Sequence, residues 1–458
     1  MSASSPDARP KIALLAPYSF GNLGNAALQR ALIERFSGIF PAAELLGCYV
    51  DPAQRELPAV TPFPFHRDVR HFAYSAQSKP GSVASANPAA TEVRKTFSKK
   101  LKSIALVART VSTMRSCLGF LRSFFGEIAF LRKAYKFAGT IDLFIVGGGG
   151  QLDDLWGGPW SLPYSLFTWA LLAKLHGKRL LILNVGAESI TTATGRWFLG
   201  RVLAYSQFHS FRDAPSRAMA VSLGSPEPNP LSPDLAFSLA ARAVSGPRPA
   251  GPLVVGISPM SYGDPRYWPA VKVQAFLNYT RVLAKVSANL ANSGHSVVLF
   301  PTQIRMDATL IEEIYCAAGP QLLPEARGRL RVAEVGSLND CLELLPALDL
   351  VLASRFHGVL LPMLTGIPII AISAESKLTE LLADFGVSQF QIPFESVTVS
   401  QVEILFDRIQ PMRSSLRDHF LSHSRHLALA LDEQFSFLQE SQLQDLIRKF
   451  PATFSRSS

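Results

Sequence analysis

The sequence predicts an α/β protein built from two Rossmann-like parallel-sheet domains that face each other across a cleft. Apolar runs of strand length alternate with helical patterns in both halves of the chain, which is typical of parallel sheets. The length of 458 residues exceeds what one hydrophobic core normally supports. A stretch rich in Pro, Gly, Ala and Arg at 241–252 separates the halves and is typical of an interdomain linker.

The first domain is expected over 1–245. It begins with an apolar strand at 11–16, a loop of Gly and Asn, and a helical pattern over 26–36. The same periodicities predict strands at 142–146, 179–186 and 206–213, and helices at 162–176, 194–205 and 216–224. Two insertions interrupt this pattern: a Pro- and Ser-rich mobile linker at 52–96 and a basic amphipathic helical segment at 97–137.

The second domain is expected over 250–395. Strands are predicted at 253–259, 296–301, 331–335, 350–354 and 367–373, and helices at 270–292, 307–317, 338–346, 357–365 and 376–385. A helical, amphipathic C-terminal tail follows at 398–458.

The net charge of +10 comes from one segment. Eleven basic residues lie between Arg94 and Lys136 and only Glu127 opposes them, so the remainder carries equal numbers of basic and acidic residues. A basic amphipathic helix suits an anionic membrane surface. The alternative is a helix pair that covers the sheet with its basic face in water. Nucleic-acid binding fits less well, because the segment is apolar along a whole face.

The first ten residues and the cysteine spacing indicate in which compartment the protein is expected. Residues 1–10 lack the profile of a secretory signal, so we expect a cytoplasmic protein, held at the inner face of the membrane if the basic segment binds lipid. The four cysteines are widely spaced and predict buried thiols, neither a disulfide frame nor a metal site.

The most informative segment is Ser354-Arg355-Phe356-His357-Gly358, between a buried strand and a helix. A helix N-terminus beside an arginine favours an anion site, and a nearby imidazole can transfer protons. The alternative is a structural ion pair for Arg355 and a helix cap for His357.

Two glycine loops follow strands of the first domain. The first carries Asn22, Gly24 and Asn25 and does not match a dinucleotide fingerprint, so an ordinary turn is the alternative to ligand binding. The second, Gly147–Gly150, suggests that something packs closely against its backbone.

Polar residues follow the second glycine loop and the strand at 206–213. Gln151, Asp153 and Asp154 come directly after the glycines; the aspartates could accept protons from sugar hydroxyls or cap a helix. Arg212 could bind a carboxylate or pair with Asp213. The sequence contains no P-loop, zinc-protease or hydrolase motif and no metal-ligand cluster.

Taken in order, these segments resemble the polysaccharide pyruvyl transferase family over roughly residues 11–390. The matching pieces are GNLGNAAL, DLFIVGGGGQLDD, FRDAPS, PDLAF at Pro233–Phe237, and SRFHGVLLPMLTGIPIIAIS followed by Glu375, Ser376 and Lys377. The SRxH segment followed by G-x-P is the most specific part of the likeness.

The resemblance implies a GT-B-like fold and a transferase with phosphoenolpyruvate as donor, a sugar diol as acceptor and no cofactor or metal. It implies Arg355 and Arg212 for the two anionic groups of the donor, Lys377 for the departing phosphate, and His357 with Asp153 or Asp154 for proton transfer. Gly148 and Gly149 are then expected near the donor, and Asn22, Gly24, Asn25 and Gln151 near the acceptor.

Two other functions stay open at this point. One is a GT-B-type glycosyltransferase that uses a nucleotide sugar, and the other is an inactive binding subunit of a polysaccharide assembly complex. The intact SRFH and FRD segments count against the second alternative, whereas Asn25, which stands where many family members have Asp, leaves it open.

Overall fold

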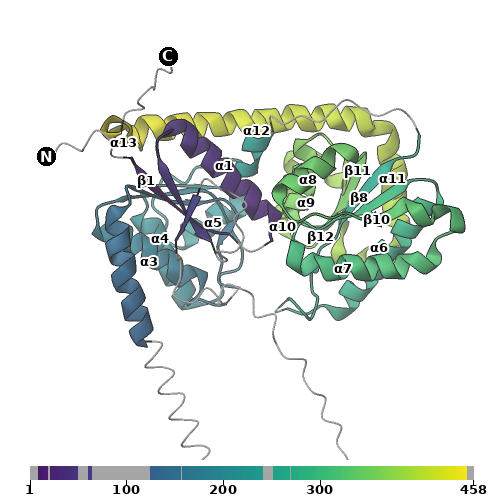
Figure 1. Ribbon diagram of the computed structural model, residues 1–458, viewed down its shortest axis with the longest axis horizontal. Coiled ribbons are helices and arrows are strands. Elements are labelled where there is room, and N and C mark those ends of the chain that lie inside the picture. Colours follow the sequence, from purple (N-terminus) through teal and green to yellow (C-terminus); the bar gives the residue numbers. More distant parts are fainter. Residues whose placement is uncertain are drawn as a thin grey trace, which may run out of the picture.

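A computed structural model of the chain describes residues 9–18, 21–49, 60–63, 124–155, 157–240, 251–268 and 270–450. These residues form two α/β domains side by side, and a long C-terminal helix runs along both (Figure 1). The two parallel sheets confirm the predicted fold class.

The N-terminal sheet has seven strands. They are β1 (Lys11–Tyr18), β2 (Glu44–Tyr49), β3 (Val60–Phe63), β4 (Leu143–Gly147), β5 (Gly150–Leu152), β6 (Arg179–Ala187) and β7 (Phe208–Phe211). All pairings are parallel, in the order β3-β2-β1-β4-β6-β5 with β7 also beside β6. The described helices are α1 (Leu23–Ile39), 124–140, α3 (Leu162–Leu175), α4 (Ala193–Tyr205) and α5 (Ala214–Ser222).

The C-terminal sheet has six parallel strands in the order β10-β9-β8-β11-β12-β13. They are β8 (Val254–Ser258), β9 (Ser296–Leu299), β10 (Leu330–Val332), β11 (Leu350–Ala353), β12 (Ile369–Ser373) and β13 (Gln391–Pro393). The helices are α6 (Val273–Asn292), α7 (Ile304–Ala318), α8 (Leu338–Leu344), α9 (Phe356–Leu364), α10 (Ser376–Asp384) and α11 (Val399–Ile409). Strands β11 and β12 are buried throughout, as helices on both faces require.

The C-terminal helices return to the N-terminal domain. Helix α12 (Arg413–Ser441) leaves the second domain and crosses to the first, where α13 (Gln444–Lys449) follows it (Figure 1). Phe435 of α12 packs on Phe36 of α1 with ring centroids 5.9 Å apart. Asp445 pairs with Arg179 at 2.8 Å, so the predicted tail ties the two domains together.

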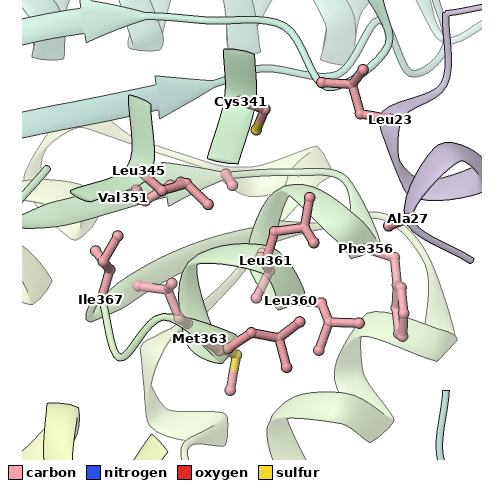
Figure 2. Close-up of a cluster of buried hydrophobic side chains, with 14 of the residues drawn as sticks. Leu23, Ala27, Cys341, Leu345, Val351, Phe356, Leu360, Leu361, Met363 and Ile367 are labelled. Carbon is pink, nitrogen blue, oxygen red and sulfur yellow. The ribbon is translucent and has the colours of Figure 1, made fainter. Parts of the chain in front are cut away.

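Apolar side chains continue from one domain into the other. Leu23 and Ala27 of α1 lie near Phe356 at the start of α9 (Figure 2). This packing brings the N-termini of α1 and α9, and therefore the first glycine loop and the SRFH loop, to one junction. Burying such side chains contributes about 1.5–3 kcal/mol each.

Some details differ from the sequence predictions. Residues 60–63, within the predicted linker, form an edge strand beside β2. The basic segment is described as a helix from 124, and residues 97–123 lie outside the described part. Cys341 is buried as expected, whereas Cys316 is exposed. Within the described ranges, no helix is long and apolar enough to cross a bilayer.

Candidate active site

The predicted motifs follow the strands at the two topological switch points. In sheets of this order, ligands bind beyond the carboxyl ends of the two strands where the connections diverge. These strands are β1 and β4 in one domain and β8 and β11 in the other. Both glycine loops and the SRFH loop follow three of these four strands.

The loops of the two domains contact each other directly. The amide of Leu23 donates to the carbonyl of Thr302 at 3.0 Å, and the amide of Ile304 donates to that of Gly21 at 2.8 Å. His357 lies against Gly24, where a Cβ atom would fall 2.0 Å from the imidazole Nδ1. Gly24 is therefore required because it makes room for His357.

His357 also faces a buried carboxylate of the first domain. Its Nε2 lies 3.7 Å from Oδ1 of Asp234, an ion-pair distance beyond hydrogen-bond reach. Burial alone would raise the pKa of Asp234, but the imidazole and the guanidinium of Arg212 lower it to about 2. At this separation the pair is an electrostatic contact without a hydrogen bond.

Arg212 is enclosed by carboxylates and an aromatic ring. It donates to Asp213 and Asp234, both at 3.2 Å, and its guanidinium carbon lies 4.6 Å from the ring centre of Phe356. The side chain is 7% exposed. Gly186 makes room for it, since a Cβ atom there would fall 2.7 Å from Nη2. The alternative of a structural Arg–Asp pair therefore describes Arg212 in this structure.

Arg355 is held by a carboxylate that sequence reasoning did not identify. Its Nε and Nη2 donate to both oxygens of Asp307, at 2.6 and 2.7 Å. Asp307 is fully buried and also accepts from the amides of Ser261 and Gln303. The alternative of a structural ion pair therefore describes Arg355 in this structure, because the buried carboxylate needs a cationic partner.

Lys377 bridges the two domains. Its Nζ lies 2.7 Å from Glu188, which follows β6, and 3.2 Å from Glu375, which precedes α10. Burial would raise the pKa of Glu188, but the ammonium of Lys377 lowers it. At 22% exposed, Lys377 is more accessible than either arginine.

Asp153 has a raised pKa of the kind that suits proton transfer. Burial raises its pKa to about 7, against the opposing effect of the Leu155 amide, which donates to Oδ1 at 2.6 Å. Glu188 and Asp154 raise the pKa further and Lys377 lowers it. At neutral pH this carboxyl is close to half-protonated, so it can both give and take a proton.

Asp154 forms hydrogen bonds at the start of a helix, as in the helix-capping alternative considered for it. Its two oxygens accept hydrogen bonds from the amides and hydroxyls of Thr191 and Thr192, at 2.5 to 3.1 Å. Although burial opposes the change, these bonds lower the pKa of Asp154. The carboxylate fixes the start of α4.

The glycine and asparagine residues of the two loops also stabilise the loops themselves. Asn22 caps α1, because its Oδ1 accepts from the amides of Gly24 and Asn25. Gly148 and Gly149 both have positive φ, 65° and 66°, which only glycine adopts readily. The Gly148 amide donates to the carbonyl of Leu183, so it is not available to the donor.

Two buried polar atoms at this junction have no hydrogen-bond partner within the described ranges. They are Oε1 of Gln151 and Nε2 of His357. An unsatisfied buried polar atom costs about 1–3 kcal/mol, so a ligand that bonds to it regains that free energy.

A comparison with known protein families identifies the family of this chain. The family model of the polysaccharide pyruvyl transferases matches residues 22–376. The chain belongs to this family. No curated protein sequence matches it.

Solved structures share the fold of this pyruvyl transferase family member. One is HepE of Anabaena in complex with UDP, with TM-score 0.55 and 11% identity over 94% of this chain and 100% of that one. Another is the trehalose 6-phosphate synthase of Burkholderia multivorans, with TM-score 0.53 and 11% identity over 96% and 100%. The likeness shows a GT-B-type fold, with two parallel-sheet domains and a long C-terminal helix.

Of the five carboxylates that surround the predicted cations of this family member, sequence reasoning identified only Asp213 as a partner. Those acidic residues are Asp213, Asp234, Glu188, Glu375 and Asp307. Asp213, Asp234 and Glu375 stand in the quoted motifs and could have been found there, whereas neither Glu188 nor Asp307 lies in any of them. Together they outnumber the three permanent cations Arg212, Arg355 and Lys377.

Proposed function

We propose that this chain transfers a pyruvyl group from phosphoenolpyruvate to a sugar diol, forming a ketal on a polysaccharide or its lipid-linked precursor. One observation carries the proposal within the family: Asp153, beside the N-terminal switch point and near Lys377, has a pKa of about 7. Ketal formation needs such a group, because one proton must be added to carbon and two must leave hydroxyls.

The reaction balances without a cofactor or metal. A general acid protonates the methylene carbon of phosphoenolpyruvate, which becomes a methyl group and leaves an oxocarbenium-like centre at C2. One sugar hydroxyl attacks C2 and loses its proton to a base. The C2–O bond to phosphate breaks, the second hydroxyl closes the ring, and its proton leaves with the phosphate or the base.

We assign the proton transfers to Asp153 and His357, one on each side of the domain junction. Asp153 is the base on the sugar hydroxyl and His357 the acid toward the donor. Gln151 Oε1, buried without a partner among the described residues, accepts a hydrogen bond from an acceptor hydroxyl. Gln151 Oε1 and His357 Nε2, which have no hydrogen-bond partner among the described residues, would each gain one from the bound substrates.

We assign donor binding to Lys377 and Arg212. Lys377 is the more exposed, and exchanging Glu188 for the donor phosphate requires movement of one flexible side chain. Arg212 stays paired with Asp213 and Asp234 and contributes positive charge to the donor site without contacting the donor directly. Arg355 holds the SRFH loop through Asp307 and acts as a positioning residue, in place of the donor contact first expected.

The excess of carboxylates has a consequence for donor binding. A trianionic donor enters a junction that holds five carboxylates besides Asp153 and Asp154, against the three cations Arg212, Arg355 and Lys377, so binding is favoured when Asp153 is protonated. The affinity for phosphoenolpyruvate is therefore expected to fall as the pH rises through 7.

A donor screen tests the proposal. Calorimetric titration with phosphoenolpyruvate and with UDP-sugars, at pH 6 and pH 8, compares the proposed donor with that of a GT-B-type glycosyltransferase. Saturable binding of phosphoenolpyruvate that weakens at pH 8 supports the proposal. Binding of a UDP-sugar alone favours the glycosyltransferase, and binding of neither donor favours an inactive subunit.

A further inference from the structure

Exposed aromatic side chains gather on the outer helices of the N-terminal domain. The structure describes five Phe and Trp side chains that are exposed, and four of them belong to this region: Phe124, Phe125, Trp160 and Trp197, against Phe437 elsewhere. Trp160 is 65% and Trp197 is 51% exposed. Soluble surfaces rarely concentrate large aromatic side chains in this way.

The aromatic side chains form one surface because the helices that carry them are packed together. Trp160, just before α3, and Trp197, on α4, both contact Phe198, each with ring centroids 5.4 Å apart. Tyr164 of α3 donates to Glu127 on the helix 124–140 at 2.9 Å, which brings the start of that helix to the same place. We call this surface the aromatic face.

The helices that carry the aromatic face have an excess of basic residues. The helix 124–140, α3 and α4 carry one acidic residue, Glu127, and six basic residues: Arg132, Lys133, Lys136, Lys174, Arg196 and Arg201. Arg201 lies over the ring of Trp197, 5.7 Å from its centre. Interleaved tryptophan and basic side chains are typical of proteins that lie on anionic bilayers.

The aromatic face adjoins the candidate active site. In a parallel α/β domain the helices run against the strands, so their N-termini lie at the carboxyl edge of the sheet, where ligands bind. Thr192, the N-cap of α4, donates to Asp154, the neighbour of Asp153. Trp197 lies in the second turn of the same helix. A bilayer against this face would therefore bring membrane lipids next to the site.

We propose that the aromatic face docks the protein on a bilayer surface containing anionic lipids, so that a lipid-linked sugar acceptor enters the active site from the membrane. The occupant is a lipid surface, because the face combines exposed tryptophan with an excess of positive charge. The orientation toward the acceptor rests on the proposed function, whereas the docking itself does not.

Vesicle co-sedimentation of the full chain tests the docking without donor or acceptor. Phosphatidylcholine vesicles with and without phosphatidylglycerol are compared for the wild type, Trp160→Ala/Trp197→Ala, Lys133→Glu/Lys136→Glu and the control Phe437→Ala. Phe437 is 52% exposed on α12, which lies along the other side of the domain in Figure 1. Circular dichroism checks that each variant is folded.

The wild type and Phe437→Ala are expected to bind the phosphatidylglycerol vesicles equally. Removing both exposed tryptophans in Trp160→Ala/Trp197→Ala is expected to weaken binding about tenfold or more. Reversing both lysines is expected to weaken it about tenfold or more, only on anionic vesicles. The proposal is overturned if the wild type does not co-sediment with anionic vesicles, or if Trp160→Ala/Trp197→Ala binds them as tightly as the wild type does. A failure of pyruvyl transfer on a soluble acceptor would sink the proposed function and leave this result standing.

Discussion

Replacing Asp153 with asparagine is expected to abolish transfer and to make the protein more stable at neutral and alkaline pH. Burial raises the pKa of Asp153 from 3.8 to about 7, so the ionised side chain destabilises the folded state. A pKa difference of about 3 corresponds to about 4 kcal/mol. Asparagine keeps the shape of the side chain and can still accept from the Leu155 amide.

The sign of the stability change follows from the pH at which Asp153 loses its proton in the folded and in the unfolded protein. Below pH 3.8 the carboxyl of Asp153 is protonated in both states and costs nothing. Between pH 3.8 and about 7 only the unfolded chain ionises, so the wild type loses about 1.4 kcal/mol of stability per pH unit. Above about pH 7 both states are ionised and the loss is constant.

Urea unfolding measures this directly. Asp153→Asn is expected to exceed the wild type in free energy of unfolding by about 2 kcal/mol at pH 5 and about 4 kcal/mol at pH 8. Asp154→Asn is the control: its hydrogen bonds lower the pKa of Asp154, so this variant should be less stable than the wild type, by the same amount at both pH values. A gap between Asp153→Asn and the wild type that stays constant from pH 5 to pH 8 would refute the reasoning.

Three further substitutions test the geometry of the site. Gly24→Ala places a Cβ atom against His357 and is expected to lower kcat about 100-fold in a folded protein, whereas Gly38→Ala, on the same helix in open space, should leave kcat unchanged. Asp307→Asn leaves its buried arginine partner without a counter-charge and is expected to cost about 3–5 kcal/mol in chemical denaturation; a loss below 1 kcal/mol would contradict a structural pair. Lys377→Ala is expected to raise the KM for phosphoenolpyruvate about tenfold or more, and an unchanged KM would remove it from donor binding.

The sequence predicted the fold well because its signals are local. The predicted strands at 142–146 and 350–354 are apolar apart from one terminal residue each, Asp142 and Ser354, as strands buried on both faces must be, and β4 and β11 lie there. The edge strand β3 was missed because its four residues, VTPF, include a proline and lie in a stretch of weak periodicity. The return of α12 to the first domain depends on long-range packing that helical periodicity does not reveal.

The structure brings the predicted site residues to one junction, whereas the partners of their side chains could only partly be predicted. Strand-end loops identify which residues meet, and they placed Gly24 and His357 at one junction. Roles depend on partners distant in the chain. Arg355 was expected to face the donor, yet Asp307, 48 positions away, holds its guanidinium. Glu188 and Lys377 also influence the pKa of Asp153. They lie far from it in the sequence, so only the fold reveals that they are its neighbours.

The central claim is that carbon passes from phosphoenolpyruvate to a sugar. Incubation with phosphoenolpyruvate labelled with carbon-13 at C2 and a polysaccharide or lipid-linked acceptor, followed by NMR of the product, tests it most directly. We predict a labelled ketal carbon bonded to two sugar oxygens and one inorganic phosphate released for each ketal formed. Label that stays in phosphoenolpyruvate or appears only as free pyruvate, with the acceptor unchanged, would contradict the claim.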